Sequence, residues 1–187
     1  RFDMFCEVSV FGGRNVGKQE WTKRIRSIAG TSQIGSTSFM VKGPCWTNYF
    51  NLNIYQRSHW AVTDATNRYI LIFDLTNRSS LLNEIDGVME LISRRDDKRG
   101  AMLLIGNKVD AVRPGDEEVD ATRRMARRFA EEGGLVYVET SALTGEGVAE
   151  AAYLLLNIEV RQSLENRLKG VVLPGGWSVD SSVPLPL

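Results

Sequence analysis

The chain has 187 residues, with 23 Lys and Arg against 23 Asp and Glu, so its formal net charge is zero. This length suits one domain with a tail, and the balanced charge argues against a general nucleic-acid binder, which carries a basic surplus. Two cysteines and one histidine are too few for a disulfide framework, a structural zinc site or most Ser-His-Asp schemes. No apolar run approaches the ~18 residues that span a bilayer.

The first part of the chain has the pattern of a strand, a helix and then two strands. The apolar run Met4–Phe11 predicts a buried strand, and Gly12–Gly17 predicts a turn. Lys18–Ala29 has the apolar spacing of a helix. Ser38–Lys42 and Tyr49–Tyr55 predict two strands joined around a Gly-Pro turn.

The second part alternates short apolar runs with helical patterns. The runs that predict strands buried on both faces are Tyr69–Leu75, Ala101–Gly106 and Leu135–Glu139. The segments with helical spacing are Arg78–Arg95, Asp116–Glu132 and Val148–Leu168. This alternation predicts an α/β domain over residues 1–169, with a mostly parallel sheet and helices on both faces. Gly170–Leu187 has three prolines and no period, so we expect an irregular C-terminal tail.

A glycine-rich motif lies between the first predicted strand and the first predicted helix. Gly-x4-Gly-Lys at this place is the pattern of a phosphate-binding loop, whose backbone N–H groups converge on a phosphate while the lysine reaches the outer phosphates. The alternative is an ordinary strand–helix turn that contains a lysine, although this spacing after a buried strand is much rarer than a glycine-rich turn alone. The residues that we expect to bind phosphate are Gly12, Gly13, Arg14, Asn15, Val16, Gly17, Lys18 and Gln19.

A second motif, Asn107-Lys108-Val109-Asp110, directly follows the predicted strand Ala101–Gly106. A carboxylate here can accept hydrogen bonds from N1 and N2 of guanine, a donor pair that adenine lacks, and a charge-assisted bond is worth about 1.5–3 kcal/mol. The stem of Lys108 can lie over the base. The alternative is a polar turn at a strand end, because Asn and Asp favour turns.

A third motif, Thr140-Ser141-Ala142-Leu143, follows the predicted strand Leu135–Glu139. A small residue here lets a backbone N–H approach the 6-oxo group of guanine, although these residues alone are a weak signal. The order of the three motifs adds to their value, because each follows a strand at the end where open α/β sheets bind ligands. The residues that we expect to bind guanine are Asn107, Lys108, Asp110, Ser141, Ala142 and Leu143.

With these motifs the chain resembles a Rab-like small GTPase of the Ras superfamily. Phe73–Leu81 (FDLTNRSSL) resembles the run after the fourth strand of Rab proteins, and Gln33-Ile34-Gly35 resembles the Thr-Ile-Gly of their first switch. The resemblance covers about Met4 to Glu159 and is more faithful in the back half. It implies the P-loop small-GTPase fold, with six strands and one antiparallel edge strand, bound GTP or GDP, and switch loops that read the γ-phosphate.

Two positions of the phosphate loop depart from the family pattern. Gln19 stands where the family has a Ser or Thr whose hydroxyl binds Mg²⁺, and octahedral Mg²⁺ tolerates little displacement of its ligands. The resemblance therefore leaves Mg²⁺ binding doubtful. Arg14 occupies a place that the family keeps small, beside the γ-phosphate. Its bulk should impede GAP-assisted hydrolysis unless the side chain faces solvent.

Both switch regions also depart from the pattern. Gln33 replaces the first-switch threonine if the register is counted from the third strand, whereas counting forward from the phosphate loop places Thr37 there. After Ile54-Tyr55 about eight residues of the family pattern are missing, and they carry the Asp-x-x-Gly-Gln motif that holds Mg²⁺ and the attacking water. Two explanations stay open: a true deletion, or a segment of the encoded protein that is absent from this sequence.

Three functional hypotheses remain, of which we favour an atypical Rab-like GTP-binding protein with weak or absent Mg²⁺-dependent hydrolysis that acts through protein partners. The alternatives are an active GTPase switch whose second switch is absent from this sequence, and a nucleotide-free pseudoGTPase that serves as an interaction module. We assign no catalytic or metal-binding residue. We expect a cytoplasmic protein that binds no nucleic acid and reaches a membrane only through partners. The terminal Pro-Leu-Pro-Leu encodes no prenylation site, unless a lipidated tail was removed.

Overall fold

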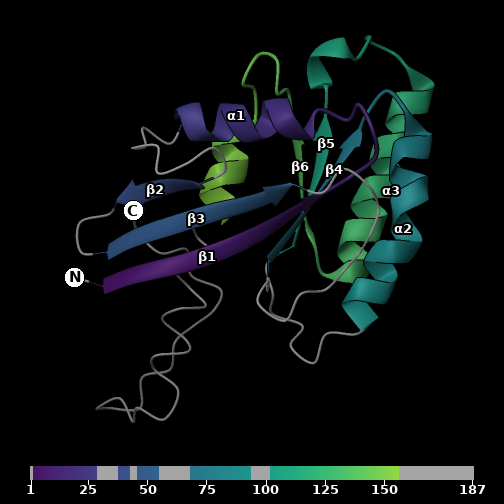
Figure 1. Ribbon diagram of the computed structural model, residues 1–187. Helices are drawn as coiled ribbons and strands as arrows, with labels where there is room; N and C mark the ends of the chain where they lie inside the picture. Colours follow the sequence, from purple (N-terminus) through teal and green to yellow (C-terminus); the bar gives the residue numbers. More distant parts are fainter. Residues whose placement is uncertain (1, 29–37, 43–45, 55–67, 94–101, 156–187) are drawn as a thin grey trace, which may run out of the picture.

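A computed structural model of the chain has a six-stranded sheet at its centre with helices on both faces (Figure 1). The structure describes residues 2–28, 38–42, 46–54, 68–93 and 102–155. The predicted tail, residues 170–187, lies outside this part of the chain, as do residues 156–169 of the predicted last helix.

The sheet has the six strands and the antiparallel edge strand that the family resemblance implies. Its strands are β1 (Phe2–Phe11), β2 (Ser38–Lys42), β3 (Trp46–Ile54), β4 (Arg68–Asp74), β5 (Met102–Asn107) and β6 (Val136–Thr140). They lie in the order β2-β3-β1-β4-β5-β6. The edge strand β2 pairs antiparallel with β3, and the other described pairs are parallel. The predicted fold class, α/β with a mostly parallel six-stranded sheet, is confirmed.

The predicted ends of some strands are wrong by a few residues. β3 begins at Trp46 instead of Tyr49, because it continues its parallel pairing with β1 as far as Phe2. The alternation of apolar and polar residues that predicted this strand does not extend over its first part, which the backbone pairing alone defines.

The helices are α1 (Lys18–Ile28), α2 (Arg78–Ser93) and α3 (Glu117–Gly133), with a short 3-10 helix η1 (Val109–Ala111) and a further helical stretch at residues 148–155. α3 starts where the Asp116 side chain accepts hydrogen bonds from the N–H groups of Glu118 and Val119. It ends at Gly134, whose φ of 65° is the left-handed conformation that favours glycine at a helix end.

Alternate residues of the strands form two hydrophobic cores, one on each face of the sheet. Ile70 and Ile72 of β4 pack on the face that α1 and residues 148–155 cover, together with Trp21. Leu71 and Phe73 point the other way and pack under α2 and α3, which lie side by side (Figure 1). This alternation explains why β4 is a continuous apolar run in the sequence.

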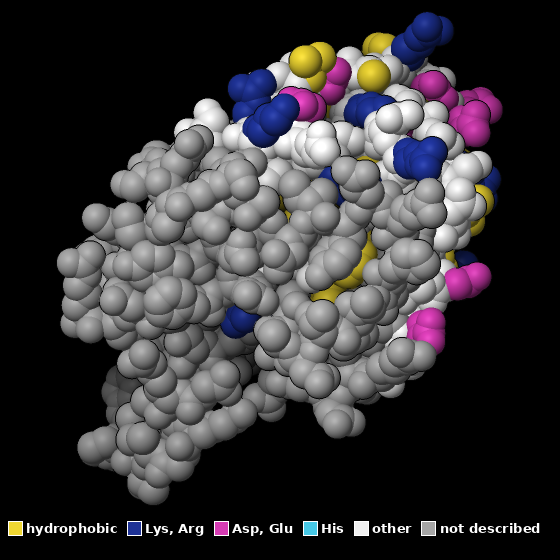
Figure 2. Space-filling view, in the orientation of Figure 1, with side chains coloured by type: hydrophobic (Ala, Val, Ile, Leu, Met, Phe, Trp, Pro, Cys, Tyr) yellow, Lys and Arg dark blue, Asp and Glu magenta, His cyan; other side chains and the backbone are white. Residues whose placement is uncertain are grey.

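The described part of the face in Figure 2 carries mixed charge. Figure 2 shows Lys and Arg side chains interspersed with Asp and Glu over the described part of one face. None of the helices in the described ranges combines the length and the apolar composition that crossing a bilayer requires.

Candidate functional site

The three predicted motifs meet at one edge of the sheet. The glycine-rich loop follows β1, Asn107–Asp110 begins at the last residue of β5, and Ser141–Leu143 follows β6. β1, β4, β5 and β6 are parallel neighbours, so the loops at their carboxyl ends lie on the same side. This is the place where open α/β sheets bind ligands.

The glycine-rich loop turns sharply before α1. Gly12 has a φ of 141°, Asn15 of 61° and Gly17 of 92°. A Cβ on Gly12 would collide with the carbonyl oxygen of Ile72, and a Cβ on Gly17 would lie 2.5 Å from Nδ2 of Asn107. Both glycines are therefore required by backbone conformation and by close approach. The loop leads directly into α1, as the motif predicts.

Lys18, the first residue of α1, closes this loop on itself. Its ammonium group donates to the carbonyl oxygens of Gly12 at 2.6 Å and Gly13 at 2.5 Å. Burial lowers the pKa of Lys18, and the negative charge of Glu84 partly offsets that effect. The structure thus places the positive charge of Lys18 inside the loop, where an outer phosphate would need it.

Asn107 connects the glycine-rich loop with the loop after β6. Its Nδ2 donates to the carbonyl oxygen of Val16 at 2.8 Å. Its Oδ1 accepts from Oγ1 of Thr140 at 3.1 Å and from the backbone N–H of Ala142 at 2.9 Å. The side chain is buried. The Ala142 amide that we expected to meet the 6-oxo group of guanine thus donates to Asn107 in this structure.

Asp110 and Ser141 form the other side of the site. The Ser141 hydroxyl donates to Oδ1 of Asp110 and accepts from the N–H of Thr144 at 2.9 Å. Asp110 lies on η1 and is exposed, whereas Ser141 is buried. The hydroxyl therefore orients an accessible carboxylate, which is the group expected to accept from guanine N1 and N2.

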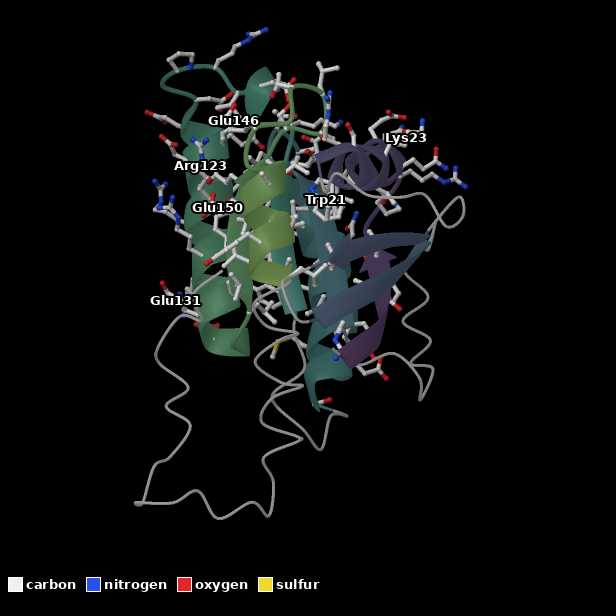
Figure 3. The ribbon with its side chains drawn as sticks, turned by 90° about the vertical axis from the view of Figure 1, so that its left-hand side faces the viewer. Trp21, Lys23, Arg123, Glu131, Glu146 and Glu150 are labelled. Atoms are coloured by element: carbon white, nitrogen blue, oxygen red, sulfur yellow. The ribbon has the colours of Figure 1, made fainter. Side chains whose placement is uncertain are left out.

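The turn after β6 is closed by its own backbone. Ser141 N–H donates to the carbonyl oxygen of Glu146 at 2.9 Å, and Gly145 N–H donates to that of Ser141 at 2.8 Å. Glu146 of this turn is labelled in Figure 3. The same view shows Trp21, which points from α1 toward the sheet. Arg24 of α1 adds a link, because its guanidinium donates to the carbonyl oxygens of Ala142 and Leu143.

Three features near the site involve residues to which the sequence analysis gave no role or a different role. Arg24 is one, and a pair between Lys108 and Asp74 is another. Lys108 has a φ of 70°, and its Nζ lies 2.6 Å from Oδ2 of Asp74, whose Oδ1 accepts from Thr76. A contact between residues at the ends of neighbouring strands depends on the strand order of the sheet, so the local sequence does not predict the Lys108–Asp74 pair.

The third is Glu84 of α2, which is 1% exposed. A Cβ on Gly13 would lie 3.9 Å from its Oε1, which places the carboxylate beside the glycine-rich loop. A signal was present, because Glu84 shares the helical spacing of the buried residues Leu81 and Val88. A carboxylate at such a position is unusual.

The remaining predicted positions are exposed or not described. Arg14 is exposed, in agreement with the solvent-facing alternative, and Gln19 is exposed at the second position of α1. Gln33, Thr37 and residues 55–67, where the switch motifs were expected, lie outside the described residues.

Comparison with known proteins shows the family to which this chain is similar. The family model described as the Ras family matches residues 53–161, more than half of the chain. The match contains the Asn107 and Ser141 motifs but not the glycine-rich loop.

The chain is also similar to curated relatives. It is 36% identical over 94 residues to Ras-related protein Rab-27B of Homo sapiens, which is 50% of this chain and 41% of that protein. It is 40% identical over 80 residues to Ras-related protein Rab-4 of Dictyostelium discoideum, or 43% of this chain and 37% of the relative. Ras-related protein Rab11A of Lotus japonicus is 34% identical over 109 residues, which is 56% of this chain and 46% of that protein. The aligned segment thus spans less than half the length of each of these relatives.

Proposed function

Because the chain belongs to the Ras family, we propose that it is an atypical Rab-like protein that binds GTP or GDP. In this proposal it hydrolyses GTP slowly or not at all and acts through protein partners. The loops after β1, β5 and β6 hold the nucleotide, and the partners read the protein's surface.

The observation that carries nucleotide binding is the position of Asn107. Its amide ties the glycine-rich loop at Val16 to the turn after β6 at Ala142, with distances of 2.8 and 2.9 Å. These bonds fix the spacing between the loop that we assign to the phosphates and the loop that we assign to the base. A preorganised site of this kind avoids part of the ordering cost of binding.

Each loop then has a role. The backbone of Gly12–Lys18 and the Lys18 ammonium hold the phosphates. Asp110, oriented by Ser141, accepts hydrogen bonds from N1 and N2 of guanine and so discriminates against adenine. Because the Ala142 amide donates to Asn107, the Leu143 N–H is the better donor to the 6-oxo group.

The donor set does not fit Mg²⁺. Gln19 offers a long amide side chain, exposed, where the family places a hydroxyl, and octahedral Mg²⁺ demands short, well-placed oxygen ligands. We therefore derive no hydrolytic step through Mg²⁺.

The experiment that tests this proposal is the identity of the co-purified nucleotide. The purified protein is denatured, and the released nucleotide is separated by ion-exchange chromatography. We expect GDP or GTP in a stoichiometric amount. Protein that is empty, and that stays empty after incubation with guanine nucleotides, would favour the pseudoGTPase alternative, and an adenine nucleotide would contradict the role of Asp110.

A further inference from the structure

A carboxylate lies buried beside the phosphate-binding loop. Glu84 of α2 is 1% exposed, and its Oε1 would lie 3.9 Å from a Cβ placed on Gly13. Leu81 and Val88, one turn away on either side, are fully buried. The Glu84 side chain therefore lies on the buried face of α2, next to the glycine-rich loop.

The charge of Glu84 acts on Lys18. The carboxylate raises the pKa of Lys18 against the larger effect of burial, which lowers it. Burying a carboxylate is costly unless a positive charge and hydrogen bonds compensate for it. Lys18, held by the carbonyl oxygens of Gly12 and Gly13, is a positive charge in the same loop that this carboxylate influences.

A nucleotide would bring further negative charge to the same place. Its phosphates would be attracted by Lys18 and by the loop amides, but the negative charge of Glu84 would repel them. This repulsion is weakly screened because the carboxylate is buried. The repulsion grows with the number of phosphate charges near Lys18. A neutral ligand that uses only the base loops would not experience it.

We propose that Glu84 is a built-in counter-anion that sets how much phosphate charge the site accepts. It stabilises the loop in the nucleotide-free protein and weakens binding in proportion to the charge of the phosphates. The inference rests on the proposed function, because it takes the glycine-rich loop to be the phosphate site. Its consequence is that the γ-phosphate of GTP adds little affinity beyond that of GDP.

The test compares Glu84→Gln, which removes the charge and keeps the shape, with the unmutated protein. Calorimetry in EDTA gives the Kd of guanosine, GMP, GDP and GTP. We expect no change for guanosine, roughly tenfold tighter binding of GDP and a larger gain for GTP. Asp86→Asn, which removes an exposed carboxylate from the same helix, is the matched control and should change each Kd by less than about twofold.

Unchanged GDP binding, or an equal change for all four ligands, would overturn the inference, because a purely structural Glu84 would not distinguish ligands by charge. Glu84→Met serves as a second variant with the same expected order if the glutamine variant does not fold. Inorganic tripolyphosphate separates the two proposals. If it binds and gains affinity in Glu84→Gln while guanine nucleotides do not bind, only the proposed function fails. If neither binds, both proposals fail.

Discussion

At the scale of single residues, the site depends on side chains that hold loops together as well as on those that face a ligand. Asn107 bonds to Val16, Thr140 and Ala142, and Ser141 bonds to Asp110. Asp110 is the exposed member of this set. Substitution of Asp110 should therefore affect the ligand more than the fold, whereas substitution around Asn107 should affect both.

We expect Asp110→Ala to weaken guanine nucleotide binding by roughly 10- to 100-fold, because a charge-assisted pair is lost. Adenine nucleotides should bind poorly to both proteins. Isothermal titration with GDP and ADP measures both effects, and Asp86→Ala on α2 is the control for removal of a surface carboxylate. Equal affinities of the unmutated protein for GDP and ADP would remove the role given to Asp110.

A second prediction concerns Gly17. Gly17→Ala strains a φ of 92° and places a Cβ 2.5 Å from Nδ2 of Asn107, so it should break the bond from Asn107 to Val16. Gly115→Ala is a matched control, because Gly115 has a φ of 79° and nothing within 4 Å of the added Cβ. The control should cost about 1 kcal/mol of unfolding free energy, and Gly17→Ala at least about 2 kcal/mol.

Urea denaturation of both variants measures the difference. Equal losses for the two would mean that the collision with Asn107 contributes nothing to stability.

At the scale of elements, α3 and β6 hold the edge of the sheet that carries Ser141. Arg123 of α3 donates from Nε to both carboxylate oxygens of Glu139 at 3.0 Å, and from Nη2 to Oε2 at 2.9 Å. The hydroxyl of Tyr137 donates to Oε1 of the same carboxylate. Hydrogen bonding to Glu139 raises the pKa of Arg123, and burial raises the pKa of Tyr137 above its usual range. This network positions the strand that leads into the turn to which we assign base binding.

The start of α3 gives a prediction at this scale. Asp116→Ala removes the acceptor for the N–H groups of Glu118 and Val119 and should cost about 1 kcal/mol of unfolding free energy. Asp116→Asn keeps a capping oxygen and should cost much less. Chemical denaturation compares the two variants, and similar losses from both would show that the cap does not stabilise α3.

The helices and strands of this fold were largely predictable, because the spacing of apolar residues along the sequence indicates which side chains are buried. The alternating burial of β4 under two different cores matches a continuous apolar run, and Gly134 ends α3 as a glycine after a helical pattern is expected to. The start of β3 was missed because pairing with Phe2, not side-chain alternation, extends it.

The site was predictable only as motifs. The positions of Gly12–Lys18, Asn107 and Ser141 follow from their places after strands. Their partners do not, because the bond from Asn107 to Val16 joins residues 91 apart in the sequence. Glu84 could have been noticed as a charge on an apolar helix face, but only the structure places it beside Gly13.

At the scale of the whole molecule, one sheet edge collects the loops to which we assign nucleotide binding, and Gln19 stands where the family pattern has a Mg²⁺-binding hydroxyl. Nucleotide binding in this account relies on the loop amides, Lys18 and Asp110, which GDP and GTP share. Glu84 offsets the gain that Lys18 would otherwise make on the γ-phosphate. A ligand that interacts equally with two states shifts neither, so exchange of GDP for GTP should be a poor conformational trigger.

Hydrolysis should be correspondingly slow. We expect single-turnover conversion of bound GTP at or below the intrinsic rate of Ras-like enzymes, ~10⁻⁴ s⁻¹, with or without added Mg²⁺. Quenched time points separated by ion-exchange chromatography give the rate. Brisk hydrolysis that depends on Mg²⁺ would restore the ordinary GTPase switch.

The most direct test of the central claim is one calorimetric comparison of GDP with a non-hydrolysable GTP analogue, each titrated in Mg²⁺ and in EDTA. We expect four Kd values within roughly threefold of one another, a spread of about 0.7 kcal/mol. A loss of affinity of about 100-fold or more in EDTA, or a comparable preference for the triphosphate in Mg²⁺, would contradict it.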